Sequence, residues 1–326
     1  MKALRVAILG AGSIAKHMAA ALSLCEEMQP WAVAAREESR AKAFAQQHGF
    51  ARYYGSYGAM LQDRDVDLVY LAVPHALHYD YAMMCLRAGK NVLLEKPFTA
   101  NASQAEEVID LARKKGLMAA ECLWMGYLPV VEKIKGLCAG GRIGEVKMLS
   151  GEIGYHLTQE RLFDPQMAGG ALLDIGVYAV GLASIVFGCD VQKIVSSATF
   201  TRQGMDETNS FIFQYQDGRM ASFSTSMTYM SDCRGTIWGS NGYAVIENVN
   251  RLNMIRVYDG AHQEIDCYTN PNVKNSYVFV LKSVYKALQE GWIDTPEASH
   301  ADILQRMKMM DALRKQWNMV YPFEKV

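Results

Sequence analysis

The feature that most constrains the fold is a glycine-rich turn that directly follows an apolar run near the N-terminus. The run, Leu4 to Leu9, is typical of a strand covered on both faces, and Gly10-Ala11-Gly12-Ser13-Ile14-Ala15 follows it at once. In this G-x-G-x-x-A pattern, Gly10 permits a tight turn, Gly12 lets the backbone approach a pyrophosphate, and Ala15 lets helix and strand pack closely. Alone it is a weak signal, because an ordinary Gly-rich strand-to-helix turn has the same letters.

The segments after this turn alternate between strand-like and helix-like patterns. Apolar runs lie at 31–35, 67–73, 91–94 and 117–120, and helical patterns lie at 14–25, 39–47, 77–88 and 103–115. This alternation is typical of a parallel, doubly wound α/β sheet. We therefore predict an N-terminal Rossmann domain over residues 1–122, whose first strand-to-helix turn binds a dinucleotide.

The pattern changes after residue 122. Helical patterns at 129–138 and 169–187 flank a strand at 146–154 and an irregular polar stretch at 155–168. Between 191 and 267, short strands alternate with turn signals such as Asp217-Gly218, and two helical patterns end the chain. We predict that residues 123–326 form a C-terminal α+β domain with a large, open, mostly antiparallel sheet and helices on one face. An uncovered sheet face is typical of a dimer surface.

Charge and composition restrict the partners. The formal net charge is −1, which gives no strong attraction to nucleic acid or to anionic membranes. No apolar run approaches the roughly 18–20 residues that span a bilayer. The seven cysteines form no C-x-x-C pair, which favours reduced, buried thiols over disulfides or a zinc site. We expect a cytoplasmic protein with a small-molecule partner, without nucleic acid, membrane or metal.

The end of the second predicted strand bears on the choice between NAD and NADP. An NAD enzyme usually places Asp or Glu there to bind both ribose hydroxyls. This chain has Arg36 there, with Arg40 one helical turn later. Two guanidinium groups match the geometry of a 2′-phosphate, although both could be solvated surface arginines and Glu37 or Glu38 could reach a ribose. We expect NADP, with NAD as the second candidate.

A Glu95-Lys96-Pro97 motif follows the predicted strand at 91–94. A lysine at the carboxyl end of a parallel strand lies in the ligand crevice. Because lysine is costly to bury, such a residue normally has a task or a partner. A salt bridge between Glu95 and Lys96 is the structural alternative.

Another predicted strand ends in Pro74-His75-Ala76-Leu77-His78. Two histidines three residues apart do not make a zinc site without further ligands nearby. We expect His78 to contact or support the cofactor, whereas a plain helix-start residue is a fair reading of His75. The expected cofactor-binding residues are Gly10, Gly12, Ser13, Ile14, Arg36, Arg40, Ala72, Pro74, His78, Glu95 and Lys96.

The helical pattern that opens at Gly169-Gly170 carries Asp174 and Tyr178, which share one helix face because they are four residues apart. A carboxylate and a phenol on an otherwise apolar helix need a polar cavity or mutual bonds. One reading is a buried tyrosine bonded to Asp174, and the other is an acid–base tyrosine with its partner. The segment alone does not decide between them.

Taken together, Gly10-Ala11-Gly12, Glu95-Lys96-Pro97 and Asp174-Ile175-Gly176-Val177-Tyr178 resemble the Gfo/Idh/MocA oxidoreductases over essentially the whole chain. Further segments, among them Ala120 to Trp124 and Ala168 to Gly176, are similar to the branch of dimeric dihydrodiol dehydrogenases and NADP-dependent D-xylose dehydrogenases. The resemblance implies a nicotinamide-dependent oxidoreductase. It also implies a homodimer or higher homo-oligomer through the C-terminal sheet.

The resemblance further implies a role for each matching residue. Lys96 matches the catalytic lysine, Tyr178 the general acid/base, and Asp174 a carboxylate that orients substrate and lysine. Trp124 matches an aromatic residue on the substrate side, and Tyr155 is a polar candidate near the substrate mouth. The expected substrate-facing residues are Trp124, Tyr155, Asp174 and Tyr178.

These roles predict hydride transfer between nicotinamide and a sugar, polyol or dihydrodiol-like substrate, with Tyr178 as acid/base and Lys96 as its partner. Gly126 replaces an arginine that many relatives carry, and residues 155–167 match no relative well, so substrate and direction stay open. Two alternatives remain, a catalytically silent NADP-binding regulatory protein and a reductase of another small carbonyl compound on the same fold. Retention of Lys96, Asp174 and Tyr178 together favours an enzyme.

Overall fold

The structure, a computed structural model, describes residues 3–271 and 275–324 and divides into two compact units. Unit 1 comprises Met1–Tyr127 and Val273–Leu304, and unit 2 comprises Leu128–Asn272 and Gln305–Val326. Residues 123–326 were expected to form the second domain, whereas the described residues 275–304 belong to unit 1.

The return of the chain to unit 1 has a local cause. Helix α8 (Tyr277–Gln289) is amphipathic, and its apolar stripe, which includes Val280 and Val284, is fully buried against α1 and the short helix η2. Beyond α8, the main-chain N–H of Ala119 in the edge strand β6 donates to Ile293 O at 3.0 Å. Unit 1 therefore takes part of its core from a segment far along the chain.

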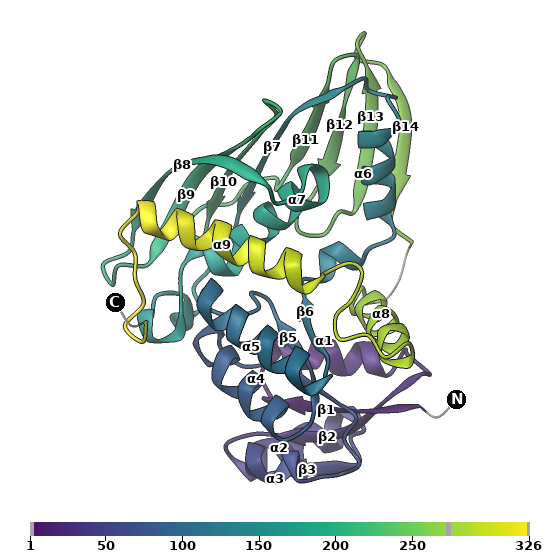
Figure 1. Cartoon of the computed structure of the whole chain (residues 1–326), viewed down its shortest axis with the longest axis vertical. Coiled ribbons are helices and arrows are strands. Elements are labelled where there is room, and N and C mark those ends of the chain that lie inside the picture. The colour runs from purple at the N-terminus through teal and green to yellow at the C-terminus, as the bar shows by residue number, and fades with distance from the viewer. Residues whose placement is uncertain (1–2, 272–274, 325–326) are drawn as a thin grey trace. The chain divides into compact units, whose positions relative to one another are not determined.

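The described part of unit 1 contains a six-stranded parallel sheet in the order β3-β2-β1-β4-β5-β6 (Figure 1). This is the strand order of a Rossmann fold, so the predicted fold class of this half is confirmed. The strands are β1 (Leu4–Leu9), β2 (Met28–Ala34), β3 (Arg52–Tyr54), β4 (Leu68–Leu71), β5 (Asn91–Glu95) and β6 (Ala119–Cys122). The helices are α1 (Ser13–Leu22), α2 (Glu38–His48), α3 (Tyr57–Leu61), η1 (His75–Leu77), α4 (His78–Arg87), α5 (Ala102–Lys115), η2 (Trp124–Tyr127) and α8.

Unit 2 is built on an eight-stranded sheet, counted over the described residues, in the order β14-β13-β12-β11-β7-β10-β9-β8. All neighbours are antiparallel except the parallel pair β7 and β10, which confirms the predicted mostly antiparallel sheet. The strands are β7 (Val146–Gly154), β8 (Val191–Phe200), β9 (Asp206–Tyr215), β10 (Met220–Ser226), β11 (Gly235–Gly239), β12 (Gly242–Glu247), β13 (Met254–Asp259) and β14 (Glu264–Thr269). The helices are α6 (Val130–Ala139), η3 (Glu160–Leu162), η4 (Pro165–Met167), η5 (Leu172–Gly176), α7 (Val177–Phe187) and α9 (His300–Gln316), the last of which begins in unit 1.

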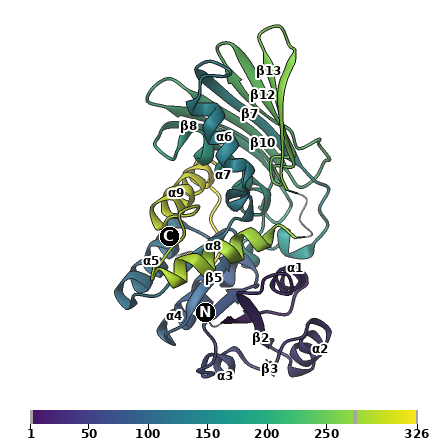
Figure 2. The same cartoon turned by 90° about the vertical axis from the view of Figure 1, so that its right-hand side faces the viewer.

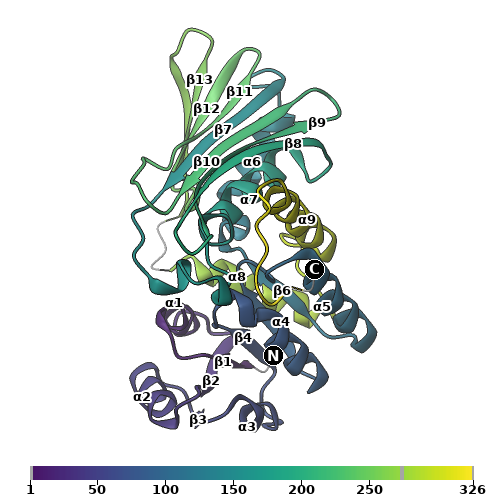
Figure 3. The same ribbon diagram turned by 90° about the vertical axis from the view of Figure 1, so that its left-hand side faces the viewer.

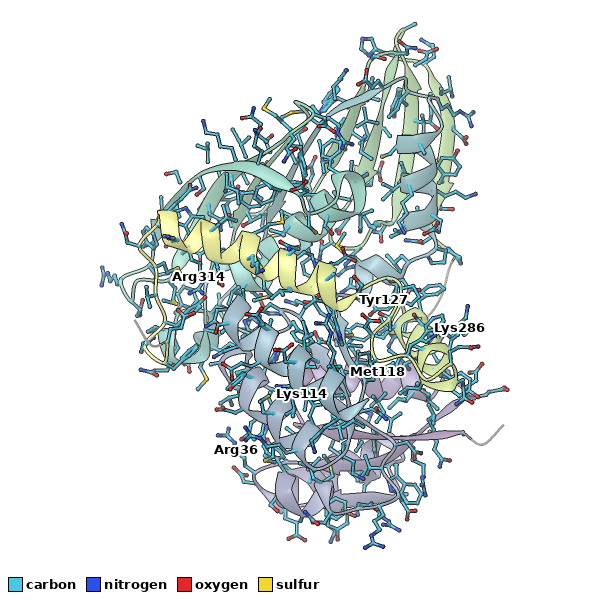
Figure 4. The ribbon with its side chains drawn as sticks, viewed as in Figure 1. Arg36, Lys114, Met118, Tyr127, Lys286 and Arg314 are labelled. Carbon is cyan, nitrogen blue, oxygen red and sulfur yellow. The ribbon has the colours of Figure 1, made fainter. Side chains whose placement is uncertain are left out.

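The two faces of the sheet in unit 2 differ in cover. Helices α6 and α7 lie on one face, and no helix of the described residues covers the other, bare face (Figures 2 and 3). Strand β9 alternates accordingly: Phe211 and Phe213 are buried toward the helices, whereas Ile212 is 42% exposed. Arg314 of α9 (Figure 4) forms an ion pair with Glu324 at 2.8 Å and ties the C-terminal segment to this unit.

The segment Pro165–Phe187 corrects one expectation from the sequence. By length and composition it is apolar enough to cross a membrane, although no such run was expected. Within the structure, 83% of its apolar window is buried, and most residues of α7 are buried. A helix that is apolar all round and buried in this way is a core helix.

Candidate active site

The turn between β1 and α1 has the geometry of a phosphate cradle. Gly10 has a φ of +106°, and a Cβ there would lie 2.4 Å from the main-chain oxygen of Ala72 at the end of β4, so glycine is required. Gly12 is the N-cap of α1, and a Cβ added to it would have nothing within 4 Å. Among the described residues, no side chain caps this helix and no acidic residue lies in its first turn. Its N–H groups and the positive end of its dipole can therefore receive an anion.

Arg36 and Arg40 lie just beyond the end of β2, and both are exposed. Arg36 projects from the surface of unit 1 (Figure 4). Burial raises the pKa of Tyr57, and the positive charges of Arg36 and Arg40 oppose this rise. This part of unit 1 therefore presents two cations beside the expected ribose position.

His78 is turned toward the protein instead of toward a ligand. Its side chain is 0% exposed, Nδ1 lies 2.8 Å from Pro97 O, and Nε2 lies 3.0 Å from Val73 O. Burial lowers the pKa of this imidazole. Both ring nitrogens thus lie beside main-chain carbonyls of the protein, which favours the supporting role among the two roles expected for His78. Ala72 and Pro74, at the end of β4, lie on the strand end that adjoins the Gly10 turn.

Lys96 leaves β5 with its main chain held by a buried carboxylate. The N–H of Lys96 donates to Glu95 Oε2 at 3.2 Å, and the hydroxyls of Tyr70 and Tyr277 both donate to Glu95 Oε1. Burial raises the pKa of Glu95, and these hydrogen bonds counteract the rise. The ring of Tyr277 also stacks on Trp124, with 6.3 Å between ring centroids. Glu95 therefore fixes the main chain at the strand end where Lys96 lies. Tyr277 contacts both Glu95 and Trp124 and so connects these two residues.

In unit 2, Asp174 and Tyr178 lie on the helix formed by η5 and α7, which begins as a π-helix. The first N–H of this helix, on Leu172, donates to Asp206 Oδ2 at 2.7 Å, and the side-chain amide of Asn209 donates to the same oxygen at 2.8 Å. Asp206 is fully buried, which raises its pKa to about 7. A carboxylate from β9 thus caps the helix that carries both candidate residues.

The two glycines before this helix are required by close contacts. A Cβ on Gly169 would lie 2.4 Å from Leu162 O, and one on Gly170, with a φ of +106°, would lie 2.1 Å from Asp206 Oδ1. The contact with Leu162 holds the preceding irregular segment against the helix. From that segment, Arg161 Nη2 donates to Asp174 Oδ1 at 3.0 Å.

Tyr178 and Tyr155 have different settings within unit 2. Tyr178 is 8% exposed in the first turn of α7. The hydroxyl of Tyr155 donates to Asn250 Oδ1 at 2.8 Å, and burial raises its pKa to about 12. The Tyr155 hydroxyl is therefore already hydrogen-bonded within unit 2. We expect only the aromatic ring of Tyr155 to contact a substrate.

Each unit thus gathers one part of the expected site. Unit 1 holds the Gly10 turn, the arginines, Lys96 and Trp124, and unit 2 holds Asp174 and Tyr178. Sequence reasoning missed Arg161, Asp206 and Tyr277. Arg161 lies in an irregular stretch, Asp206 begins a strand, and Tyr277 belongs to an ordinary amphipathic helix, so no spacing signal marked them.

Two family models match the chain. A model described as "Oxidoreductase family, NAD-binding Rossmann fold" matches residues 4–122, and one described as "GFO/IDH/MocA C-terminal domain" matches residues 131–245. The boundary between the two matches lies close to the end of β6.

Full-length relatives are similar over nearly the whole chain. A trans-1,2-dihydrobenzene-1,2-diol dehydrogenase of Xenopus tropicalis is 33% identical over 324 residues, which is 97% of this chain and 98% of the relative. The Homo sapiens protein of the same name is 32% identical over 334 residues, 99% of each chain.

Solved structures are similar in fold. A 3-ketoreductase from Actinomadura kijaniata, solved with NADP and TDP-benzene, superposes with a TM-score of 0.89 at 25% identity, covering 96% of this chain and 98% of that one. An aldose–aldose oxidoreductase from Caulobacter crescentus gives a TM-score of 0.87 at 22% identity, covering 96% and 97% of the two chains, and shows the fold alone.

Proposed function

The chain belongs to the GFO/IDH/MocA oxidoreductase family, and from this premise we propose that it transfers hydride between NADP and a sugar, polyol or dihydrodiol-like substrate. One observation carries the proposal. In the unit with the Rossmann strand order, a lysine follows β5 and its main chain is fixed by a buried, doubly hydrogen-bonded glutamate. A lysine at the carboxyl end of a parallel strand lies where a Rossmann fold binds its ligand.

The residues of unit 1 fit a dinucleotide. The uncapped N-terminus of α1 would hold the pyrophosphate, with Gly10 and Gly12 allowing its approach. Arg36, with Arg40, would bind the 2′-phosphate, because guanidinium groups donate two parallel hydrogen bonds to phosphate oxygens. The Actinomadura reductase with NADP supports this choice over NAD.

The chemistry divides between the cofactor and two side chains. The nicotinamide, when bound, supplies the hydride acceptor for oxidation and the hydride donor for reduction. In the oxidation direction, the hydrogen of the substrate C–H bond leaves with the bonding electron pair, the O–H proton goes to the phenolate oxygen of Tyr178, and a C=O bond forms. A free phenol titrates near ~10, so proton exchange at neutral pH needs a cation, and we assign that role to Lys96. Asp174 would accept a hydrogen bond from a neighbouring substrate hydroxyl.

The test is a substrate panel read by the absorbance of reduced nicotinamide. Wild-type protein is mixed with NADP or NAD and with aldoses, polyols and trans-dihydrodiols. The proposal expects reduction of NADP by one of these classes, with NAD the poorer acceptor. Binding of NADPH without turnover of any class would contradict the proposal and favour a regulatory NADP-binding protein.

We also propose that the bare face of the sheet in unit 2 joins two copies of the chain. Apolar side chains on this face are unusually exposed: Val195 49%, Ile212 42%, Met220 40% and Trp238 43%. The strand register places all four on one side of the sheet, interspersed with serines such as Ser210 and Ser224, and exposed large apolar side chains on an open sheet face are typical of a homodimer interface. Sedimentation of wild-type protein and of Ile212→Glu tests this, with a dimer expected for the first and a monomer for the second.

A further inference from the structure

The irregular segment before the catalytic helix holds a second charged side chain at Asp174. Arg161 Nη2 lies 3.0 Å from Asp174 Oδ1, and the two side chains are 41% and 13% exposed. Both residues belong to unit 2. The Asp174 carboxylate is therefore mostly covered by protein, whereas the Arg161 side chain is more open to solvent.

The backbone around Arg161 is fixed, so this contact differs from that of a mobile surface arginine. The next residue, Leu162, is fully buried and its N–H donates to Gln159 O at 2.9 Å. Leu162 O accepts from Gly170 N at 2.9 Å, at the point where the chain turns into the helix that carries Asp174. A side chain presented from a short helix anchored on both sides loses little further freedom when it binds.

The pair offers complementary hydrogen-bonding groups. An ionised carboxylate only accepts hydrogen bonds, and a guanidinium only donates them. In the described part of the chain, the guanidinium of Arg161 is paired through Nη2, and a guanidinium has further N–H groups beyond that one. A hydroxyl on the carbon next to the reacting carbinol matches such a pair, because its O–H donates to the carboxylate while its oxygen accepts from the guanidinium. A substrate without that hydroxyl makes neither bond at this position.

We infer that Arg161 is a specificity-determining residue which, with Asp174, selects substrates that carry a hydroxyl next to the reacting carbinol. The inference rests on the proposed function and narrows its substrate class to vicinal diols, which include aldoses and dihydrodiols. Arg161 takes no part in the hydride or proton transfer. Its loss is therefore expected to act on KM more than on kcat.

The experiment compares substrates with and without the adjacent hydroxyl. Wild-type protein and Arg161→Gln are assayed with NADP on two probe pairs, D-glucose with 2-deoxy-D-glucose and trans-cyclohexane-1,2-diol with cyclohexanol. Arg161→Gln is expected to lower kcat/KM for the vicinal member of an active pair about tenfold or more, mainly through KM, because a hydrogen bond to a charged group is lost. The other member should change by less than about twofold, since it never used that bond.

Three further variants separate the role of Arg161 from structural effects. Arg161→Lys keeps the charge without the fork of donors and should restore part of the preference. Arg161→Gln in an Asp174→Asn background should add little to the loss, because the pair acts as one unit. Arg234→Gln is the matched control: Arg234 is also ion-paired in unit 2, with Asp232 at 3.6 Å, and its loss should leave the preference unchanged.

The outcomes separate a failure of the role of Arg161 from a failure of the proposed function. Equal effects of Arg161→Gln on both members of a pair, with active wild-type protein, would overturn the inference and leave the proposed function standing. Wild-type protein that binds NADPH but oxidises no member of either pair would contradict the proposed function and the inference together.

Discussion

Replacing Asp206 by asparagine probes how the helix with Asp174 and Tyr178 is held. The Asp206 side chain is 0% exposed, caps the helix at 2.7 Å, and has a pKa raised by burial to about 7. Asparagine keeps the shape and one accepting oxygen but cannot titrate. Its amide N–H groups would lie beside Gly170, where a Cβ would be 2.1 Å from Asp206 Oδ1.

The magnitude follows from the difference between the folded and unfolded pKa. Because the pKa of Asp206 is raised in the folded protein, the folded state holds its proton longer, and stability falls as the pH rises from the unfolded value of 3.8 to about 7. The fall is about 1.4 kcal/mol per pH unit, or roughly 4 kcal/mol over this range. Asparagine carries a pH-independent cost of about 1–3 kcal/mol for a buried, unpaired N–H.

The assay is urea unfolding of wild-type protein and Asp206→Asn at about pH 5 and about pH 8. From about pH 5 to about pH 8, the free energy of unfolding of wild type should fall by roughly 2–3 kcal/mol relative to that of Asp206→Asn. Asp190→Asn controls for the loss of one carboxylate at an exposed position of the same unit. If wild type and Asp206→Asn changed by the same amount from acid to alkaline pH, the raised pKa of Asp206 would be refuted.

The other predictions concern unit 1. Gly10→Ala should lose NADPH binding, measured by fluorescence titration, because its Cβ would meet Ala72 O at 2.4 Å; Gly12→Ala should keep the thermal stability of wild type and lose only affinity. Arg36→Ala should weaken NADPH binding about tenfold while NADH binding is unchanged, since only the phosphate contact is lost; equal weakening of both would speak against the assignment. Tyr277→Phe should lower the free energy of unfolding by about 1–3 kcal/mol in urea, because a buried carboxylate loses a donor; an unchanged value would show that the bond contributes nothing.

Much of the fold follows from local sequence patterns. The run at 4–9 and the strand at 146–154 are observed with the predicted bounds, because their flanking glycines and apolar periods are strong local signals. Strand β3 and helix α3 were missed because segments of three and five residues are too short to show a period. The return of α8 to unit 1 depends on long-range packing, which no local pattern encodes.

The candidate site was less accessible from sequence. Motif positions such as Lys96 are found because a lysine at a strand end is chemically unusual. The sequence left both cofactor contact and a supporting role open for His78, and the contacts of its ring nitrogens with main-chain carbonyls depend on the tertiary structure. Arg161 and Asp206 contact the helix from distant or irregular segments, so only the structure reveals them.

The most direct test of the proposed function is turnover of the best panel substrate by wild type, Lys96→Met and Tyr178→Phe, with NADPH affinity measured on the same samples. The account predicts that both variants lose turnover and keep NADPH affinity within about twofold, because both side chains act on the substrate proton and most of the expected cofactor contacts are made by other residues of unit 1. Normal turnover in either variant would contradict the assignment of that residue to the reaction.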